Sequence, residues 1–202
     1  MSELKFLLVD DDESVRRALK RALSRHGEVD AVGTCAAARM AIAARRYDAA
    51  VFDYHLPDGR GIDLIDRARE RSAHIQVLVL TGSADHAVIS SVHAKKASYL
   101  LKPVDLKHLE MLAHEAKDRR DASDRRLGVV LASWTADCDL SDVEAELLEL
   151  GARGVPREMF ARRRRVRPDT IRRQIQSLLR KTGHSTFEAA VTGLLREAIE
   201  EP

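Results

Sequence analysis

The stretch Ala49-Ala50-Val51-Phe52-Asp53 decides the fold, because a short apolar run ends on a single carboxylate and then enters the turn-rich loop Tyr54-His55-Leu56-Pro57-Asp58-Gly59. An apolar run of this length, bounded by Gly and Pro, is typical of a strand buried on both faces in a parallel sheet. A second run, Phe6-Leu7-Leu8-Val9, ends in the same way on Asp10-Asp11-Asp12. Parallel strands that end in acids place their carboxylates at one edge of the sheet, where open α/β folds bind ligands.

Strand-like and helix-like segments alternate five times along roughly the first 120 residues. We expect strands at about 5–9, 29–32, 49–53, 75–80 and 99–101. We expect helices at about 13–23, with Gly27 as a stop, and at about 36–44, 62–71, 84–94 and 106–116. Such an alternation predicts a doubly wound, five-stranded parallel sheet.

The next segment is first highly charged, over residues 117–126, and then apolar at Val130, Leu131 and Trp134. The charged part fits a solvated helix extension or a linker. The apolar patch fits a cover for either domain or a contact with another copy of the chain. We place the first domain at 1–120, a linker at 121–137 and a second domain at 138–202.

The second domain has only helical signals. Ser141 and Glu144 have the spacing of a capping box, and Gly151 and Gly154 are expected to end the helix that it opens. Pro156 and Pro168 are expected to begin the next two helices. In the third helix an apolar stripe is formed by Ile171, Ile175, Leu178 and Leu179. The opposite side carries Asp169, Arg172, Arg173, Gln176 and Arg180.

Charge is unevenly distributed, although the formal net charge is only +2. Residues 151–183 hold eleven basic side chains against Glu158 and Asp169. Such a local excess indicates a polyanionic partner, and a solvated basic face is the alternative. Arg and Gln read guanine and adenine edges in the major groove, and further Arg residues hold phosphates. A short helix, a tight basic turn and a helix with an apolar back and an Arg/Gln front have the layout of a helix-turn-helix.

Cellular context follows from simple absences in the sequence. Cys35 and Cys138 are too few and too far apart for a disulfide scaffold, and no metal-binding cysteine spacing occurs. No signal peptide or membrane-length apolar run is present, so we expect no membrane partner. We expect a cytoplasmic, reduced protein.

Polar residues at the predicted strand ends suggest phosphate chemistry. The set is Asp10, Asp11, Asp53, Thr81 and Lys102. Crowded carboxylates repel one another unless a cation joins them, and Mg²⁺ takes one or two carboxylates together with phosphate oxygens. Lys102 adds a compact positive charge and Thr81 a hydroxyl donor. Together these groups would trap a phosphoryl group on a carboxylate nucleophile.

Four motifs occur in order: Leu7-Leu8-Val9-Asp10-Asp11, Asp53-Tyr54-His55-Leu56-Pro57 with Gly61, Leu80-Thr81, and Tyr99-Leu100-Leu101-Lys102-Pro103. Over about residues 3–120 they resemble the receiver domain of two-component response regulators. The resemblance implies a flavodoxin- or CheY-like fold in which Asp53 accepts phosphate from a histidine kinase.

The resemblance also implies a Mg²⁺ site. Asp11 would bind the ion directly, Asp10 largely through water, and Asp53 and the backbone carbonyl of His55 would complete the protein ligands. A degenerate receiver that folds but is never phosphorylated is the alternative.

Two residues would carry the switch that the resemblance implies. Thr81, together with Lys102, would bind the phosphoryl group, and Tyr99 would be the aromatic side chain that moves inward on activation. No substrate pocket is evident, so we expect a phosphoacceptor with slow self-dephosphorylation and no multiple-turnover enzyme.

A second set of motifs spans about residues 138–200: Leu140-Ser141, Glu144, Leu147-Leu148, Gly154-Val155-Pro156, Ala161-Arg162-Arg163, Thr170-Ile171 and Leu178-Leu179-Arg180-Lys181. It resembles the LuxR/NarL-type helix-turn-helix domain. The resemblance implies double-stranded DNA as a partner and a last helix, at 187–199, that supports a homodimer. The DNA-binding residues would be Thr170, Arg172, Arg173, Gln176 and Arg180.

Two positions depart from that family pattern. Arg164 stands where a buried Leu is usual at the turn, and Val143 stands where an Arg is common. Either the turn is rearranged, or Arg164 extends its charge outward while its stem packs inside.

We therefore predict a phosphorylation-switched transcription regulator, in which phosphorylation either uncovers the DNA-binding face or builds a dimer. Two other functions compete with this one. In the first, the basic helices bind polymerase or another protein and do not read DNA. In the second, the first domain is a true phosphatase.

Overall fold

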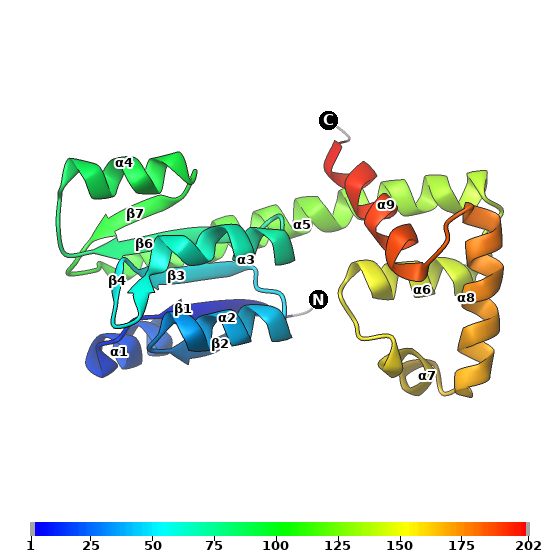
Figure 1. Cartoon of the computed structure of the whole chain (residues 1–202), viewed down its shortest axis with the longest axis horizontal. Coiled ribbons are helices and arrows are strands. Elements are labelled where there is room, and N and C mark those ends of the chain that lie inside the picture. The colour runs from blue at the N-terminus through cyan, green and yellow to red at the C-terminus, as the bar shows by residue number, and fades with distance from the viewer. Residues whose placement is uncertain (1–2, 201–202) are drawn as a thin grey trace. The chain divides into compact units, whose positions relative to one another are not determined.

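The computed structural model describes residues 3–200 and divides between Arg120 and Asp121 into two compact units. The first unit holds one parallel sheet in the strand order β2-β1-β3-β6-β7 (Figure 1). The strands are β1 (Leu4–Val9), β2 (Gly27–Val32), β3 (Ala49–Asp53), β6 (Gln76–Thr81) and β7 (Ser98–Leu101). The doubly wound, five-stranded sheet predicted from the sequence is confirmed.

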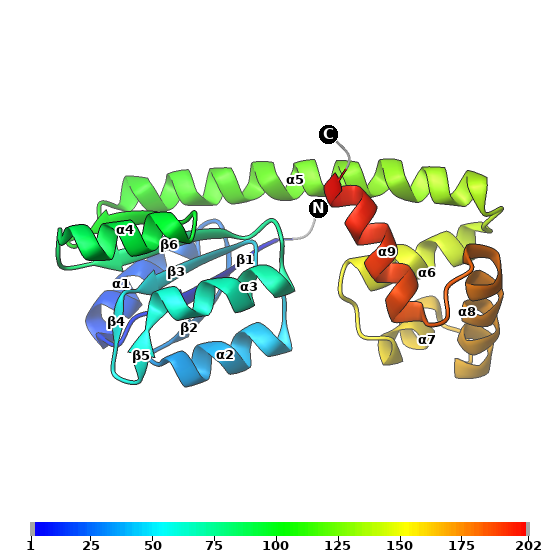
Figure 2. The same ribbon diagram turned by 45° about the horizontal axis from the view of Figure 1, so that its top comes forward.

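Helices cover both faces of this sheet (Figure 2). One face carries α2 (Cys35–Ala44), α3 (Ile65–Arg71) and α4 (His86–Ala94), and the other carries α1 (Glu13–Leu23) and the first half of α5 (Leu106–Asp137). Successive residues of a strand point to opposite faces. In β1, Leu7 and Val9 therefore join one core, and Phe6 and Leu8 join the other. All five residues of β3 are buried, as its apolar sequence predicts.

Gly27 does not act as a helix stop, contrary to our expectation. Helix α1 ends at Leu23 with Ser24 as its cap, and Gly27 is the first residue of β2, opposite Leu4 in β1. A Cβ atom on Gly27 would lie 2.1 Å from the carbonyl oxygen of Leu4. The glycine is therefore needed for the close approach of two backbones.

A short hairpin follows β3. It consists of β4 (His55–Leu56) and β5 (Gly59–Arg60), and the 3₁₀ helix η1 (Gly61–Leu64) then leads into α3. At Gly61 a Cβ atom would lie 2.1 Å from the carbonyl oxygen of Asp53. Gly61 thus lets the chain fold back directly beside the strand end that carries Asp53.

Residues 121–137 form the second half of the continuous helix α5, and the charged part at 117–126 lies within the same helix. Leu127 and Val130 are buried in the core of the second unit, and Leu131 and Trp134 pack against it. The indole of Trp134 stacks on His184 with ring centroids 5.4 Å apart and donates a hydrogen bond to Glu197. The apolar patch around Val130 therefore covers its own unit.

The rest of the second unit is entirely helical in the described residues. It contains α6 (Asp142–Ala152), α7 (Glu158–Arg164), α8 (Pro168–Thr182) and α9 (Phe187–Glu200). Two glycine and proline predictions need correction. Gly151 lies inside α6, where a Cβ atom would meet Val191 and Phe187 of α9 at 2.7–2.9 Å, and α7 begins at Glu158 and not at Pro156. None of the helices among residues 3–200 is long and apolar enough to cross a membrane.

Candidate functional site

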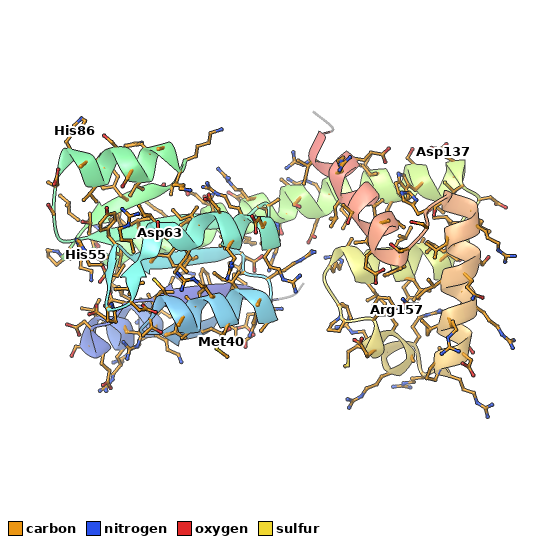
Figure 3. All side chains as sticks on the ribbon, in the orientation of Figure 1. Met40, His55, Asp63, His86, Asp137 and Arg157 are labelled. Carbon is orange, nitrogen blue, oxygen red and sulfur yellow. The ribbon has the colours of Figure 1, made fainter. Side chains whose placement is uncertain are left out.

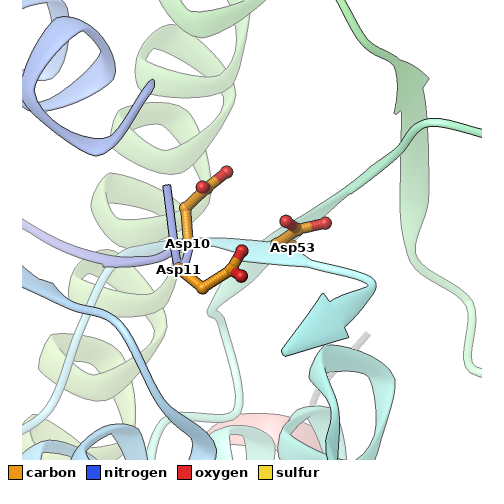
Figure 4. A group of neighbouring side chains, drawn as sticks. All are labelled: Asp10, Asp11 and Asp53. Atoms are coloured by element: carbon orange, nitrogen blue, oxygen red, sulfur yellow. The ribbon is translucent and has the colours of Figure 1, made fainter. Parts of the chain in front are cut away.

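Three carboxylates meet at the carboxyl edge of the sheet, where β1 and β3 end (Figure 4). Oxygen atoms of Asp10, Asp11 and Asp53 all lie within 4.8 Å of one another. Asp10 is fully buried and Asp53 is 6% exposed, whereas Asp11 faces solvent. The two buried acids form the floor of the site. The exposed carboxylate of Asp11 lies at its open side, where water and ligands can reach it.

This carboxylate group fits a small divalent cation. Mg²⁺ binds oxygen at about 2.0–2.1 Å, so two ligands on opposite sides of the ion are about 4.2 Å apart. The three carboxylates therefore need only small side-chain adjustments to contact one ion. The backbone N–H of Asp12 donates to Oδ1 of Asp10 at 3.0 Å and fixes the orientation of that carboxylate.

Lys102 is the positive charge of the site. Its Nζ lies 2.7 Å from Oδ2 of Asp53 and 2.9 Å from Oδ2 of Asp10. Burial alone would lower the pKa of Lys102, but its hydrogen bonds to Asp53 and Asp10 outweigh burial and raise it. Burial raises the pKa of Asp10, and the hydrogen bond from Lys102 opposes that rise. Lys102 therefore stays charged and holds two acids together that would otherwise repel.

Thr81 ends β6, next to β3, and is fully buried. Its hydroxyl donates to the carbonyl oxygen of Ser83 at 3.2 Å and accepts from the N–H of Ser83 at 3.1 Å. The structure thus brings Thr81 to the predicted edge of the sheet, with its hydroxyl bonded to the following loop.

His55 and Tyr99 lie at the margins of the site. The N–H of His55 is 3.4 Å from Oδ1 of Asp53, while the imidazole is exposed (Figure 3) and meets the Tyr54 ring edge-on. Tyr99 is half-buried in β7, with its ring 5.7 Å from that of His93. The backbone of His55 therefore contacts the carboxylate cluster, and the ring of Tyr99 packs partly against the core.

Asp58 is a site-supporting residue that the sequence did not reveal. Its carboxylate accepts from the backbone N–H groups of Cys35 and Ala36 at 2.7 and 2.8 Å, which fastens the β4–β5 hairpin to the start of α2. These bonds lower the pKa of Asp58. Within Pro57-Asp58-Gly59, Asp58 looks like an ordinary turn residue. Its role in binding the first N–H groups of α2 could have been predicted only if α2 had been expected to lie next to this loop.

In the second unit the predicted DNA-binding residues share the exposed side of α8, from which nitrogen-tipped side chains extend outward in Figure 3. Arg172, Arg173, Gln176 and Arg180 are exposed and Thr170 is half-exposed. The opposite side is buried through Ile171, Ile175 and Leu178. The amphipathic orientation of α8 thus agrees with the predicted apolar stripe.

The guanidinium of Arg164 does not extend outward, as one of the two expected arrangements required. Helix α7 ends at Arg164, and Arg165 is left-handed with φ 52°. The guanidinium of Arg164 turns inward, to Glu146 at 2.9 Å and Gln174 at 3.0 Å, with its side chain 16% exposed. The charge of Arg164 is therefore paired with Glu146 inside the second unit.

Glu144 joins the start of α6 to the end of α8. It completes the predicted capping box with Ser141, and its Oε2 lies 2.8 Å from Nζ of Lys181. Burial would raise the pKa of Glu144, but hydrogen bonds from Lys181 and Ser141 outweigh burial and lower it to about 2.

Comparisons with known proteins extend over both units. The family model described as response regulator receiver domain matches residues 6–114. The DNA-binding transcriptional activator DevR/DosR of Mycobacterium tuberculosis is 32% identical over 195 residues, which cover 89% of this chain and 88% of that protein. The nitrate/nitrite response regulator protein NarL of Escherichia coli is 26% identical over 199 residues and 92% of each chain.

Solved structures agree with the fold. A CheY-like receiver domain protein from Methanospirillum hungatei aligns with a TM-score of 0.55 and 25% identity, covering 59% of this chain and 98% of its own. Full-length FixJ from B. japonicum aligns over 100% of both chains with a TM-score of 0.53 and 21% identity, which supports the fold alone.

Replacing Lys102 by Met should make the thermal stability of the first unit more dependent on added Mg²⁺. Removing a unit positive charge next to two acids should tighten Mg²⁺ binding about tenfold, because charges a few ångströms apart interact by more than ~1 kcal/mol even near a protein surface. Thermal midpoints measured across a MgCl₂ titration test this. Lys107→Met, an exposed lysine on α5, is the control. A variant whose midpoint ignores Mg²⁺ would contradict the cation fit.

Replacing Glu144 by Gln should remove a pH-dependent part of the stability of the second unit. The folded pKa of about 2 lies below the usual 4.5, so this stabilisation is complete above pH 4.5 and is lost as the pH falls toward 2. At neutral pH the variant should be less stable by about 3 kcal/mol, the equivalent of that pKa difference. Urea unfolding at several pH values measures the gap in unfolding free energy between the wild type and the variant. The exposed Glu188→Gln is the control. A gap that stays constant down to pH 2 would rule out this pairing.

Proposed function

The chain belongs to the response regulators with a receiver domain, and from this premise we propose that Asp53 accepts a phosphoryl group from a histidine kinase. The observation that carries the proposal is the convergence of Asp53, Asp10 and Lys102 at one sheet edge, with Nζ of Lys102 bonded to both acids. A nearly buried carboxylate at the end of a fully buried strand is held in one position. It is therefore preorganised for attack on phosphorus.

The transfer of the phosphoryl group from the kinase to Asp53 needs no further reagent. A carboxylate oxygen of Asp53 bonds to phosphorus as the phosphorus–nitrogen bond to the kinase histidine breaks, and the electron pair stays on that nitrogen. Asp10, Asp11, Asp53 and the carbonyl of His55 would hold Mg²⁺, which would offset the negative charge of the phosphoryl oxygens. Lys102 would bind a phosphoryl oxygen as its hold on Asp53 loosens.

We propose that the switch begins at Thr81. Its hydroxyl would leave Ser83 and donate to the phosphoryl group, and the space vacated beside β7 would admit the ring of Tyr99. The half-buried position of Tyr99 supports such a movement. The first unit is then a phosphoacceptor with slow self-dephosphorylation.

The output we propose is transcription control through binding of double-stranded DNA. Two observations support it: the exposed Arg/Gln side of α8 and the similarity, over most of the chain, to a protein described as a DNA-binding transcriptional activator. Thr170, Arg172, Arg173, Gln176 and Arg180 would face the duplex. An active homodimer would let two such helices bind two half-sites.

Phosphorylation should occur at Asp53. Incubation with Mg²⁺ and acetyl phosphate, or with a phosphorylated histidine kinase, should add one phosphoryl group to the wild-type chain and none to Asp53→Asn, because an amide is a poor nucleophile. Intact-protein mass spectrometry measures the addition. Asp63→Asn, an exposed acid ten residues further along the chain, is the control and should still be labelled. Labelling of Asp53→Asn would refute the site.

The same pair of proteins separates the two modes of activation. Beryllium fluoride with Mg²⁺ should shift the wild type, and not Asp53→Asn, in size-exclusion chromatography if phosphorylation builds a dimer. An unchanged elution volume combined with tighter DNA binding would indicate that a covered DNA-binding face is released.

DNA binding should depend steeply on salt, since each phosphate contact contributes a slope of about −0.9 in log K against log salt. Replacing Arg172 and Arg173 by Ala should weaken binding at least tenfold, because a good base-edge contact contributes about 1–3 kcal/mol. Fluorescence anisotropy with a labelled duplex measures both effects, and Arg196→Ala on α9 is the control. Unchanged DNA binding in the double variant would favour the protein-binding alternative for the basic helices.

A further inference from the structure

Asp169 is an acid in the middle of a basic surface. Residues 151–183 hold eleven basic side chains and two acids, Glu158 and Asp169, and Asp169 is the only acid in the sequence of α8. Its side chain is 76% exposed, and it lies opposite the buried Leu178 at about 100° per residue. Four of the predicted DNA-binding residues lie within about 60° of it around the helix axis: Arg172, Arg173, Gln176 and Arg180. A duplex that contacts these residues therefore also meets the carboxylate of Asp169.

A carboxylate at this place opposes DNA binding in general. Phosphate charges line the whole duplex, so a negative charge on the contacting side repels every sequence to a similar degree. An exposed ion pair also contributes little to folding, because water screens both charges. An acid here improves binding only where it strengthens a contact that some sequences offer and others lack.

Asp169 holds one end of the guanidinium of Arg172. Nη1 of Arg172 donates to Oδ1 of Asp169 at 3.0 Å, across one helical turn. Within residues 3–200 the guanidinium makes no other hydrogen bond, so Nε and Nη2 remain available. These two adjacent N–H groups form a planar fork, and such a fork matches O6 and N7 of guanine. The carboxylate thus restricts the direction of the fork, and it offsets the charge that would attract Arg172 to any phosphate.

We propose that Asp169 is a specificity-determining residue, which directs Arg172 to a guanine in the major groove and disfavours duplexes that lack this base. Arg172 contacts the base, and Asp169 is the residue that positions it. Both lie near the N-terminus of α8, and residues at that end of a recognition helix contact base edges. The inference rests on the proposed DNA-binding function, and it names the base that one predicted contact reads.

Two kinds of duplex test the role of Asp169, in binding assays with the full-length chain carrying beryllium fluoride and Mg²⁺. One is a pool of random-sequence duplexes, and the other is the duplex that the wild-type chain enriches from that pool. Asp169→Ala should bind the random pool severalfold more tightly, because it removes a negative charge that faces the phosphates. The ratio of its affinity for the enriched duplex to its affinity for the pool should fall about tenfold, since a directed guanine contact discriminates by roughly that factor.

Glu158→Gln is the matched control. Glu158 is the other acid of the basic segment, and it is exposed at the start of α7. This variant loses the same charge from the same unit but not from the exposed side of α8. It should therefore change both affinities by the same factor and leave their ratio unchanged.

The link to Arg172 is tested by coupling. Arg172→Ala should lower the affinity ratio at least tenfold, and the double variant Asp169→Ala/Arg172→Ala should lower it no further, because both changes remove one contact. Arg180 lies eleven residues from Asp169, about 16 Å along the helix, so the effect of Arg180→Ala should add fully to that of Asp169→Ala. Replacing the guanine of the enriched duplex by adenine should weaken wild-type binding about tenfold and Asp169→Ala binding little.

An unchanged affinity ratio in Asp169→Ala would overturn the role in specificity. If both affinities fell equally and the thermal midpoint fell with them, Asp169 would only stabilise the N-terminus of α8. Additive effects of Asp169→Ala and Arg172→Ala would overturn the positioning of Arg172. A wild-type chain that binds the pool but enriches no sequence would overturn this inference and leave DNA binding intact. If the wild-type chain binds no DNA, the proposed function itself fails, and this inference fails with it.

Discussion

One lysine shared between two buried acids is the interaction on which the first unit depends. Asp10, Asp53 and Lys102 come from sequence positions up to 92 residues apart, yet Nζ of Lys102 contacts both carboxylates. In their ionised forms, three carboxylates and one ammonium leave a formal charge of −2 at this edge of the sheet. Such a site is compatible with folding because Lys102 offsets part of the repulsion, and the charge that is not offset would favour a bound cation.

The parallel sheet makes this charge cluster possible. Since β1, β3, β6 and β7 run in the same direction, the residues that follow them gather at one edge, although long stretches of chain separate them. The apolar interiors of β1 and β3, buried on both faces, prevent these strand ends from shifting. The hydrophobic core thus determines where the charges lie, and the charges determine the chemistry.

The sequence predicted those features that depend on local pattern. The positions of the strands along the chain, the Ser141–Glu144 capping box and the buried side of α8 all follow from spacings of a few residues. Predictions were wrong where a distant backbone or helix sets the local requirement. Gly27 and Gly151 were expected to end helices, but they permit close approaches to β1 and α9. Partners far away in the sequence likewise explain why the roles of Asp58 and the inward turn of Arg164 were not predictable.

The packing of Trp134 on His184 has a spectroscopic consequence. The chain contains one tryptophan, in the second unit, and its three tyrosines, Tyr47, Tyr54 and Tyr99, all lie in the first. Indole emission excited at the red edge of the absorption band therefore originates from the helical unit alone. An imidazole stacked on the indole is a quencher, so any rearrangement between α5 and the segment that joins α8 to α9 alters the emitted intensity. The protein thus carries a built-in optical reporter of its output half, with no label attached.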